Sequence, residues 1–243
     1  MHHFNTMLTA GALLALAAAP ALALDKVSFG TNWLAEAEHG GFYQAVADGT
    51  YEKFGLEVTI VQGGPQAANE ALLVSGKIDF YMGGTFSLYD AVQQGIPMVN
   101  VAAMFQKDPQ VLLAHPDSGV ETFADLAKLD TIFLGKDLLS TAFVWMKAAY
   151  PGFRDEQIKP YTFNPAPFIA APRSAQQGYV TSEPFAIEKE AGWSPKVFLF
   201  NDAGYDPYST TIETSRKLVE ENPDLVQRFV DASIIGWYNY LYG

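Results

Sequence analysis

The amino-acid sequence predicts an α/β protein with two lobes. Strand-like and helix-like hydrophobic patterns alternate along the chain from Lys26 onward. Strand–helix units of this length imply parallel strands joined by right-handed crossovers. Two polar, turn-rich connections, residues 106–110 and 201–209, bracket the middle of the chain. We therefore expect a second lobe, residues 107–202, inserted into a first lobe of residues 24–106 and 203–243, with both connections acting as hinges.

The first lobe opens with a predicted strand at 26–30, followed by a helix from His39. The residues at helical spacing in that helix are His39, Phe42, Tyr43 and Val46. Gly40 and Gly41 fall in its first turn, where small residues let a ligand come close to exposed backbone N–H groups. The plainer interpretation is a helix packed by an aromatic stripe.

The rest of the first lobe continues the alternation. The predicted elements are a strand at 56–61, a helix from Pro65 to Gly76, a strand at 77–84, a helix at 85–95 capped by Thr85, and a strand at 97–105. Proline favours the first turn of a helix and glycine its end. A long amphipathic helix is predicted from Pro223.

The second lobe repeats the pattern on a smaller scale. Its predicted elements are a strand at 110–116, a short helix at 122–129 with Thr122 as N-cap, a strand at 131–135, and a helix at 140–150 that begins at Ser140 or Thr141. Segments 159–163, 177–192 and 196–200 complete a strand–helix–strand alternation.

Residues 1–23 are predicted to be a secretory signal peptide. An apolar run at 7–19 is broken by Pro20 and followed by Ala21-Leu22-Ala23, which fits an A-x-A cleavage site. The run is shorter than the roughly 20 residues that span a membrane. No Lys or Arg precedes it, so a buried N-terminal helix is the alternative. We expect a soluble periplasmic protein.

Composition excludes several classes of function. The chain has no Cys, which rules out disulfides, thiolate metal sites, cysteine nucleophiles and a lipidated cysteine. A net charge of −12 argues against nucleic acid or anionic membrane as a partner, since both favour Lys and Arg.

Unusual residues follow several predicted strands or precede helices. In open α/β sheets, ligands bind at the carboxyl ends of strands, near helix N-termini. The residues at such positions are Asn32, Trp33, Gly83, Gly84, Thr85, Met104, Phe105, Gln106, Ser140, Thr141, Ser182 and Glu183. Each alone is typical of a cap or a turn, but their joint placement predicts a ligand cleft.

Catalysis and metal binding have weaker support. The stretch GGTFS lacks the central Ser of a nucleophile elbow, and no P-loop or GxGxxG motif appears. Only His39 and His115 remain once the signal is removed, too few for a histidine metal site. Glu36, Glu38 and His39 could chelate a metal, but a solvated acidic loop is the favoured interpretation. We predict no catalytic residues, no metal and no cofactor.

Four stretches resemble a known family. They are NWLAEAEHGGFYQAVADGTYEKFGLEVTIVQGGP, GKIDFYMGG, QQGYVTSEPFAIEKE and GYDPYSTTIE. They are similar to the periplasmic solute-binding proteins of ABC importers in the NMT1/THI5-like group, over most of residues 26–242. The resemblance implies a type II periplasmic-binding-protein fold whose lobes close on a ligand. It also implies an ABC permease as partner and a monomeric state.

The resemblance assigns roles to particular side chains. It implies aromatic sandwiching by Trp33 and Tyr43, or by a residue of the second lobe, and hydrogen bonding by His39, Thr85 and Glu183. The full set of candidate ligand-binding residues is Asn32, Trp33, His39, Tyr43, Gly84, Thr85, Phe105, Thr141, Asn164, Tyr179, Ser182, Glu183 and Tyr205.

Two stretches depart from the family pattern. Members normally continue past WYNYLYG with further helices, so we expect a first lobe truncated at its C-terminus. LAKLDTIFLGKDLLS differs from the usual loop before the second-lobe helix that carries Ser140 and Thr141.

The ligand class can be argued from residue types. A sulfonate or nitrate site would favour Arg, and the four arginines, at 154, 173, 216 and 228, all lie outside the motifs. Aromatic rings, a carboxylate and an imidazole suit a flat heterocycle, and a pyrimidine related to the thiamine precursor is our first choice. Sulfonates stay possible because helix N-termini also hold anions. Nitrate and riboflavin are further alternative ligands.

Two other classes remain open. Fungal members of the same fold group synthesise the thiamine pyrimidine, with a cysteine-rich iron site and a histidine consumed as substrate. The lack of Cys and the predicted export signal oppose that activity here. A fragment without function is the third possibility.

Overall fold

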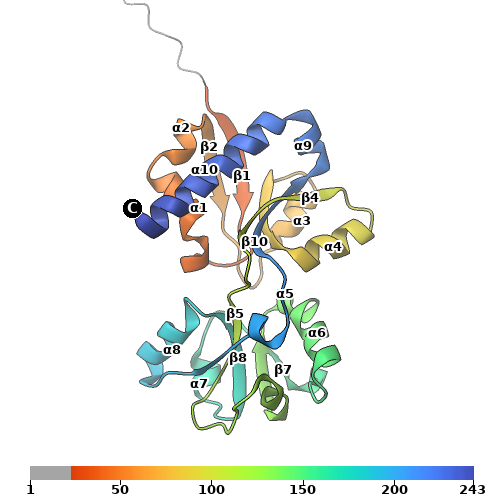
Figure 1. Cartoon of the computed structure of the whole chain (residues 1–243), viewed down its shortest axis with the longest axis vertical. Helices are drawn as coiled ribbons and strands as arrows, with labels where there is room; N and C mark the ends of the chain where they lie inside the picture. Colours follow the sequence, from red (N-terminus) through yellow and green to blue (C-terminus); the bar gives the residue numbers. More distant parts are fainter. Residues whose placement is uncertain (1–22) are drawn as a thin grey trace, which may run out of the picture.

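Two five-stranded sheets form the two lobes of the computed structural model, which describes residues 23–243 (Figure 1). The predicted signal peptide lies almost wholly outside these residues. The first sheet has the order β2-β1-β3-β10-β4 and the second β7-β6-β8-β5-β9. These two α/β units confirm the predicted fold class.

The first sheet uses strands from both ends of the described chain. Its strands are β1 (Asp25–Gly30), β2 (Leu56–Val61), β3 (Phe80–Gly84), β4 (Met98–Phe105) and β10 (Ser209–Ser215). Its helices are α1 (Gly40–Ala47), α2 (Thr50–Lys53), α3 (Asn69–Val74), α4 (Thr85–Gln93), α9 (Arg216–Glu221) and α10 (Pro223–Tyr242). A 3-10 turn, Ala37–His39, precedes α1.

The second sheet comes from one continuous stretch. Its strands are β5 (Gln110–Ala114), β6 (Thr131–Leu134), β7 (Ile158–Pro160), β8 (Ser174–Tyr179) and β9 (Lys196–Leu199). Its helices are α5 (Lys136–Leu139), α6 (Ala142–Ala149), α7 (Ala166–Ile169) and α8 (Glu183–Ala191), with 3-10 turns at Phe123–Lys128, Asp155–Gln157 and Asn201–Ala203. Thr122 is the N-cap of the first of these turns, as predicted.

Two strands depart from the parallel pairing that the strand–helix alternation implies. β10 runs antiparallel to both β3 and β4, and β5 runs antiparallel to β8 and β9. Each of these strands enters its sheet directly after the chain has crossed from the other lobe, without a preceding crossover helix. Parallel pairing holds where a helix intervenes, as between β1 and β3 and between β6 and β8.

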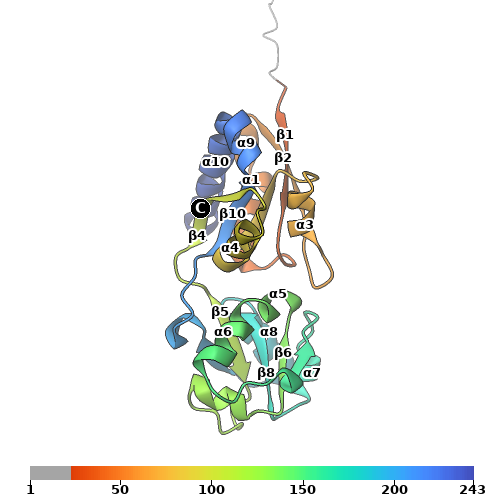
Figure 2. The same cartoon turned by 90° about the vertical axis from the view of Figure 1, so that its right-hand side faces the viewer.

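Both crossings lie on the same side of the molecule. In Figure 2 the segment from β4 to β5 and the segment from β9 to β10 run down one edge, between the two lobes. This arrangement leaves the lobes facing each other across the rest of their adjoining surfaces.

Each sheet is covered on both faces by apolar side chains. On one face of the first sheet, Phe229 of α10 stacks on Phe80 of β3, with ring centroids 4.1 Å apart, and on Tyr51 of α2 at 5.4 Å. On the other face, Leu73 and Leu88 pack from α3 and α4. The long helix from Pro223 is therefore confirmed, and its apolar stripe closes the first core.

Three local predictions need correction. The helix predicted from Pro65 begins only at Asn69, whose side-chain amide instead donates to the carbonyls of Thr31 and Val61. Thr85 is the first residue of α4 and does not cap it; Gly84 occupies the cap position. Strand β10 was not predicted, because its sequence STTIETS is mostly polar although it is almost fully buried.

The two glycines at the start of α1 make room for another helix. A Cβ atom on Gly40 would lie 2.2 Å from the ring of Tyr240, and one on Gly41 would lie 2.2 Å from Trp237. Both rings belong to α10, so the predicted space for a ligand is filled by protein. Val46, predicted for the packed face, is 44% exposed.

Within residues 23–243, none of the helices combines the length and apolar character needed to cross a membrane. The same residues contain no group of three or more His, Asp or Glu side chains placed to hold a metal ion.

Candidate ligand site between the lobes

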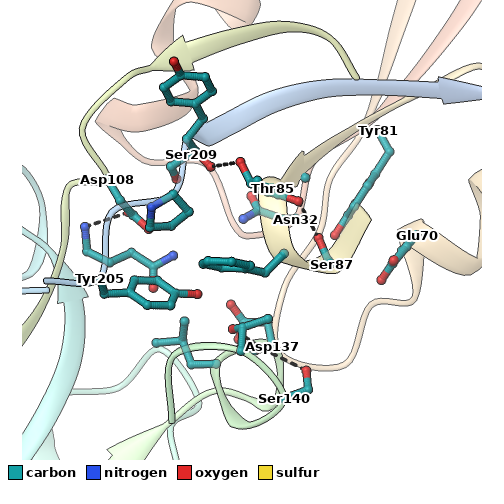
Figure 3. Close-up of a pocket in the computed structure, with 18 of the residues that line it drawn as sticks. Asn32, Glu70, Tyr81, Thr85, Ser87, Asp108, Asp137, Ser140, Tyr205 and Ser209 are labelled. Carbon is teal, nitrogen blue, oxygen red and sulfur yellow. Dashed lines mark hydrogen bonds between the residues drawn. The ribbon is translucent and has the colours of Figure 1, made fainter. Parts of the chain in front are cut away.

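A cavity with about 680 Å³ of empty volume, partly open to solvent, lies between the two lobes (Figure 3). The first lobe contributes Asn32, Glu70, Tyr81, Gly83, Gly84, Thr85, Phe86 and Ser87. The second lobe contributes Gln110, Asp137, Leu138, Ser140, Thr141 and Tyr179. The crossing segments add Asp108, Tyr205, Pro207 and Tyr208, and the first residue of β10 adds Ser209.

The ends of the strands place these side chains. β1 ends at Gly30 and β3 at Gly84, so the segments that follow them, which carry Asn32 and Thr85, lie on the edge that faces the second lobe. The loop after β1 is fixed by Thr31, whose hydroxyl donates to the carbonyl of Trp33 at 2.8 Å and accepts from the N–H of Gly63 at 2.8 Å.

A smaller pocket extends this cavity. It is lined by Asn32, Trp33, Glu36, Gln110, Asp137, Gln177, Gly178, Tyr179 and Glu183. It shares Asn32, Gln110, Asp137 and Tyr179 with the larger cavity, so the two are adjacent. Trp33 and Glu36 come from the first lobe and Glu183 from the second.

The cavity is acidic. Burial raises the pKa of Asp108 to about 6, although hydrogen bonds to its carboxylate act in the opposite direction. Burial also raises the pKa of Asp137. Among the described residues that line the cavity and the smaller pocket there is no Lys or Arg. A site of this charge favours a neutral or positively charged ligand.

Eight of the thirteen predicted residues line the cavity or the smaller pocket. They are Asn32, Trp33, Gly84, Thr85, Thr141, Tyr179, Glu183 and Tyr205. Ser182 lines a neighbouring pocket, together with Tyr161 and Phe163. The hydroxyl of Thr85 donates to the carbonyl of Tyr208 at 3.0 Å, and that of Thr141 donates to the carbonyl of Asp137 at 3.0 Å.

The other four predicted residues do not line these pockets. His39 is 0% exposed, and its Nε2 lies 3.3 Å from Oδ1 of Asn32. Phe105 packs against the first core beside Trp237, and Tyr43 is half-buried on α1. Asn164 is exposed, and its side chain accepts from the N–H of Ala166 at 3.0 Å.

The imidazole of His39 supports the loop that carries Asn32. Its Nδ1 accepts from the N–H of Glu36 at 3.3 Å. Burial lowers the pKa of His39 to about 4, so the ring is neutral at physiological pH. His39 is therefore placed to position Asn32 from behind the pocket wall.

Sequence reasoning missed several lining residues. They include Glu36, Glu70, Tyr81, Asp108, Gln110 and Asp137. Asp137 follows strand β6 just as Asn32 follows β1, so the same strand-end argument would have found it. The loop of Glu36 was interpreted as solvated, which is wrong, since Glu38 in it is 1% exposed.

Comparison with known proteins bears on this site. The family model described as NMT1/THI5 like matches residues 36–241. The chain belongs to the NMT1/THI5-like family. The match begins at Glu36 and includes both crossing segments.

Two curated proteins and one solved structure illustrate the range of this similarity. A 4-amino-5-hydroxymethyl-2-methylpyrimidine phosphate synthase of Schizosaccharomyces pombe is 27% identical over 105 residues, which are 43% of this chain and 30% of that protein. The riboflavin-binding protein RibY of Chloroflexus aurantiacus is 24% identical over 219 residues, covering 88% of this chain and 62% of RibY. The alkanesulfonate-binding protein SsuA of Xanthomonas axonopodis, bound to MOPS, superposes with a TM-score of 0.62 at 17% identity, covering 87% of this chain and 72% of SsuA.

These similarities establish the fold and the family. The NMT1/THI5-like chain has the periplasmic-binding-protein fold found in ABC-type substrate-binding proteins. It spans between 30% and 62% of the length of the curated relatives named above.

Proposed function

We propose that this NMT1/THI5-like protein is the solute-binding component of an ABC importer. It captures a small heterocycle, such as a pyrimidine related to the thiamine precursor, in the periplasm and delivers it to a membrane permease. The observation that carries the proposal is the cavity between the lobes, whose walls combine aromatic rings with carboxylates. Rings bind the faces of a flat ligand, and carboxylates accept hydrogen bonds from its amino groups.

The surroundings of the cavity fit binding better than chemistry. Its polar lining side chains are hydroxyl, amide and carboxylate groups, without a histidine. Its carboxylates come from both lobes, so a bound ligand would hold the lobes together. The relatives that make a pyrimidine phosphate are enzymes, but the cysteines we associate with that activity do not occur in this chain.

Ligands of other relatives are the second candidates. RibY supports a flavin, because its similarity covers 88% of this chain. SsuA supports a sulfonate, but the acidic lining opposes an anion.

Thermal-shift and calorimetric measurements test the proposed ligand class. The chain from Leu24 onward would be unfolded, refolded to remove any copurified ligand, and titrated with 4-amino-5-hydroxymethyl-2-methylpyrimidine, riboflavin and taurine. We expect the pyrimidine to raise the melting temperature, and Asp137→Ala to weaken its binding at least tenfold. Asp117→Asn, an exposed carboxylate away from the cavity, is the matched control. Stabilisation by taurine alone would establish the sulfonate alternative instead.

Export is tested separately. Protein recovered from the periplasm should begin at Leu24, after the predicted Ala21-Leu22-Ala23 cleavage site. Recovery of intact Met1 in the cytoplasm would contradict the proposed location.

A further inference from the structure

Three carboxyl groups that influence one another electrostatically lie where the lobes touch, beside the smaller pocket. Glu36 and Glu38 lie in the segment between β1 and α1 of the first lobe, and Glu183 is the first residue of α8 in the second. Glu36 and Glu183 both line the smaller pocket. Glu38 reaches across the gap, and its Oε2 accepts from the hydroxyl of Ser182 at 3.0 Å.

Part of this cluster lacks hydrogen-bond partners. Glu38 is 1% exposed, and its Oε1 has no partner among the described residues; the same holds for the buried Oε2 of Glu36. Glu183 is 5% exposed and is better satisfied, because it accepts from the N–H of Tyr179 at 2.7 Å and from the hydroxyl of Tyr161 at 3.1 Å. A buried acceptor without a donor destabilises the closed structure unless something supplies the donor.

None of the residues that line the two pockets beside this cluster carries a positive charge. His39 is neutral, and the other titratable side chains that line the two pockets beside the cluster are Asp137, Tyr161, Tyr179 and Glu190. Burial, followed by Glu183 and Glu38, raises the pKa of Glu36; burial, with Glu38 adding to it, raises the pKa of Glu183. Closing the empty lobes therefore favours bound protons in this cluster.

We propose that Glu36 and Glu183, one from each lobe, hold the cationic end of the ligand between them, so that the protein selects a planar cation such as an amidinium or a protonated amino-heterocycle. This inference rests on the proposed solute-binding function and narrows its ligand class. A planar cation with two N–H groups can donate to both carboxylates at once, and such charge-assisted bonds are stronger than neutral ones.

The shape of the site agrees with a ligand held at one end. The smaller pocket adjoins the larger cavity through Asn32, Gln110 and Tyr179, so a ring attached to the cationic group extends toward the aromatic lining of the larger cavity. Trp33 forms one wall of the smaller pocket, which it lines together with Asn32 and Glu36.

Three probes that share a phenyl ring and differ in the charge of its substituent test the proposal. Benzamidine is a planar cation, benzamide its neutral analogue, and benzenesulfonate an anion on the same ring. Calorimetry on the chain from Leu24 onward should show benzamidine binding at least tenfold more tightly than benzamide, with no binding of benzenesulfonate. Glu36→Gln and Glu183→Gln should each lower the ratio of the benzamidine affinity to the benzamide affinity about tenfold. The affinity for benzamide itself should change less than twofold.

Proton release gives a second readout that a merely structural role would not affect. When a cation replaces the bound protons, the heat of benzamidine binding at pH 7 should depend on the ionisation enthalpy of the buffer. That dependence should shrink in Glu36→Gln and stay unchanged in Glu57→Gln, an exposed carboxylate on β2.

The outcomes distinguish the selection of a planar cation from the broader solute-binding function. Equal affinities for benzamidine and benzamide, or a preference for benzenesulfonate, would overturn the charge selection while leaving solute binding intact. Failure of all three probes to bind would also refute the inference, whereas the solute-binding function depends on the separate ligand screen.

Discussion

Glu213 is a carboxylic acid with 0% exposure in the middle of β10. It fills the space beside Gly83 of β3, where an added Cβ would overlap its carboxylate, and its Oε2 has no hydrogen-bond partner among the described residues. Burial, followed by the charge of Glu70, raises its pKa to about 8. The folded protein therefore keeps the proton of Glu213 at a pH where the unfolded chain has lost it.

This group makes stability depend on pH with a definite sign. The unfolded chain releases the proton near the ordinary value of 4.5 and the folded protein near 8, so the free energy of unfolding falls as pH rises between them. We expect Glu213→Gln, which has no proton to release, to gain more than about 1 kcal/mol relative to the wild type between pH 5 and pH 8. Urea unfolding at both pH values measures the difference. Parallel stability curves would show that Glu213 does not titrate in this way.

Gly41 tests the close packing of α1 against α10. An added Cβ would lie 2.2 Å from the ring of Trp237, which must then move. We expect Gly41→Ala to lower the free energy of unfolding by about 1–3 kcal/mol through overpacking. Gly84→Ala is the control, because its Cβ would meet nothing within 4 Å and its backbone is extended. Equal effects on urea unfolding would contradict the packing argument.

Position at a strand end is what made site residues predictable. Asn32, Thr85 and Glu183 follow strands or begin helices, and the backbone geometry of an α/β sheet brings such positions to one edge. His39 was less predictable, because it belongs to a 3-10 turn that directs its ring toward Asn32 behind the pocket wall. Glu36 was missed because sequence gives no sign that a second lobe covers its loop.

At the scale of elements, α10 is joined to the start of the first sheet by one side chain. Arg228 bonds Asp25 of β1 at 2.6 Å, Asp224 one turn earlier at 2.7 Å, and the carbonyl of Phe54 at 3.1 Å. These contacts use several N–H groups of the planar guanidinium, which a single ammonium cannot reproduce.

Arg228→Lys should therefore cost stability despite keeping the charge. We expect a loss of about 1 kcal/mol in the free energy of unfolding, the magnitude of an ordinary hydrogen bond or two. Lys217→Gln, at the exposed pair with Glu221, should change it by less than about 0.5 kcal/mol. Chemical denaturation measures both losses. If Arg228→Lys lowered the free energy of unfolding less than Lys217→Gln does, the argument from the several guanidinium bonds would be wrong.

Elements with a strong local signal were predictable, and those set by distant contacts were not. β2 and the long helix α10 appear where the hydrophobic pattern places them. β10 is polar in sequence, and only its position between β3 and β4 buries it. The helix after Pro65 starts late because Asn69 bonds two carbonyls of neighbouring segments, an interaction that sequence spacing does not reveal.

On the scale of the whole molecule, the lobes also meet through aromatic rings. Trp33 of the first lobe stacks on Tyr161 of the second, with centroids 6.1 Å apart and planes at 16°, and meets Phe163 edge-on at 6.3 Å. Together with the bond between Ser182 and Glu38, these contacts hold the lobes close beside the smaller pocket.

Loss of the Trp33 ring should open the molecule. We expect Trp33→Ala to increase the radius of gyration of the ligand-free protein in small-angle X-ray scattering, because stacking and buried area between the lobes are lost. Trp193→Phe, a change within the second lobe, should leave it unchanged. An unaltered radius in Trp33→Ala would mean that the other contacts alone keep the lobes closed.

The first lobe cannot complete its sheet until the second lobe has been synthesised, because β10 follows the second lobe in the chain. The strand fills the place between β3 and β4, yet the whole second sheet, from Gln110 to Leu199, leaves the ribosome before it. At about 5–20 residues per second the edges of β3 and β4 stay unpaired for roughly 5–20 s. The second lobe can complete its sheet in that time, whereas the first presents open strand edges on which other chains can pair. Until β10 is in place, we therefore expect the first lobe to depend on chaperones more than the second lobe does.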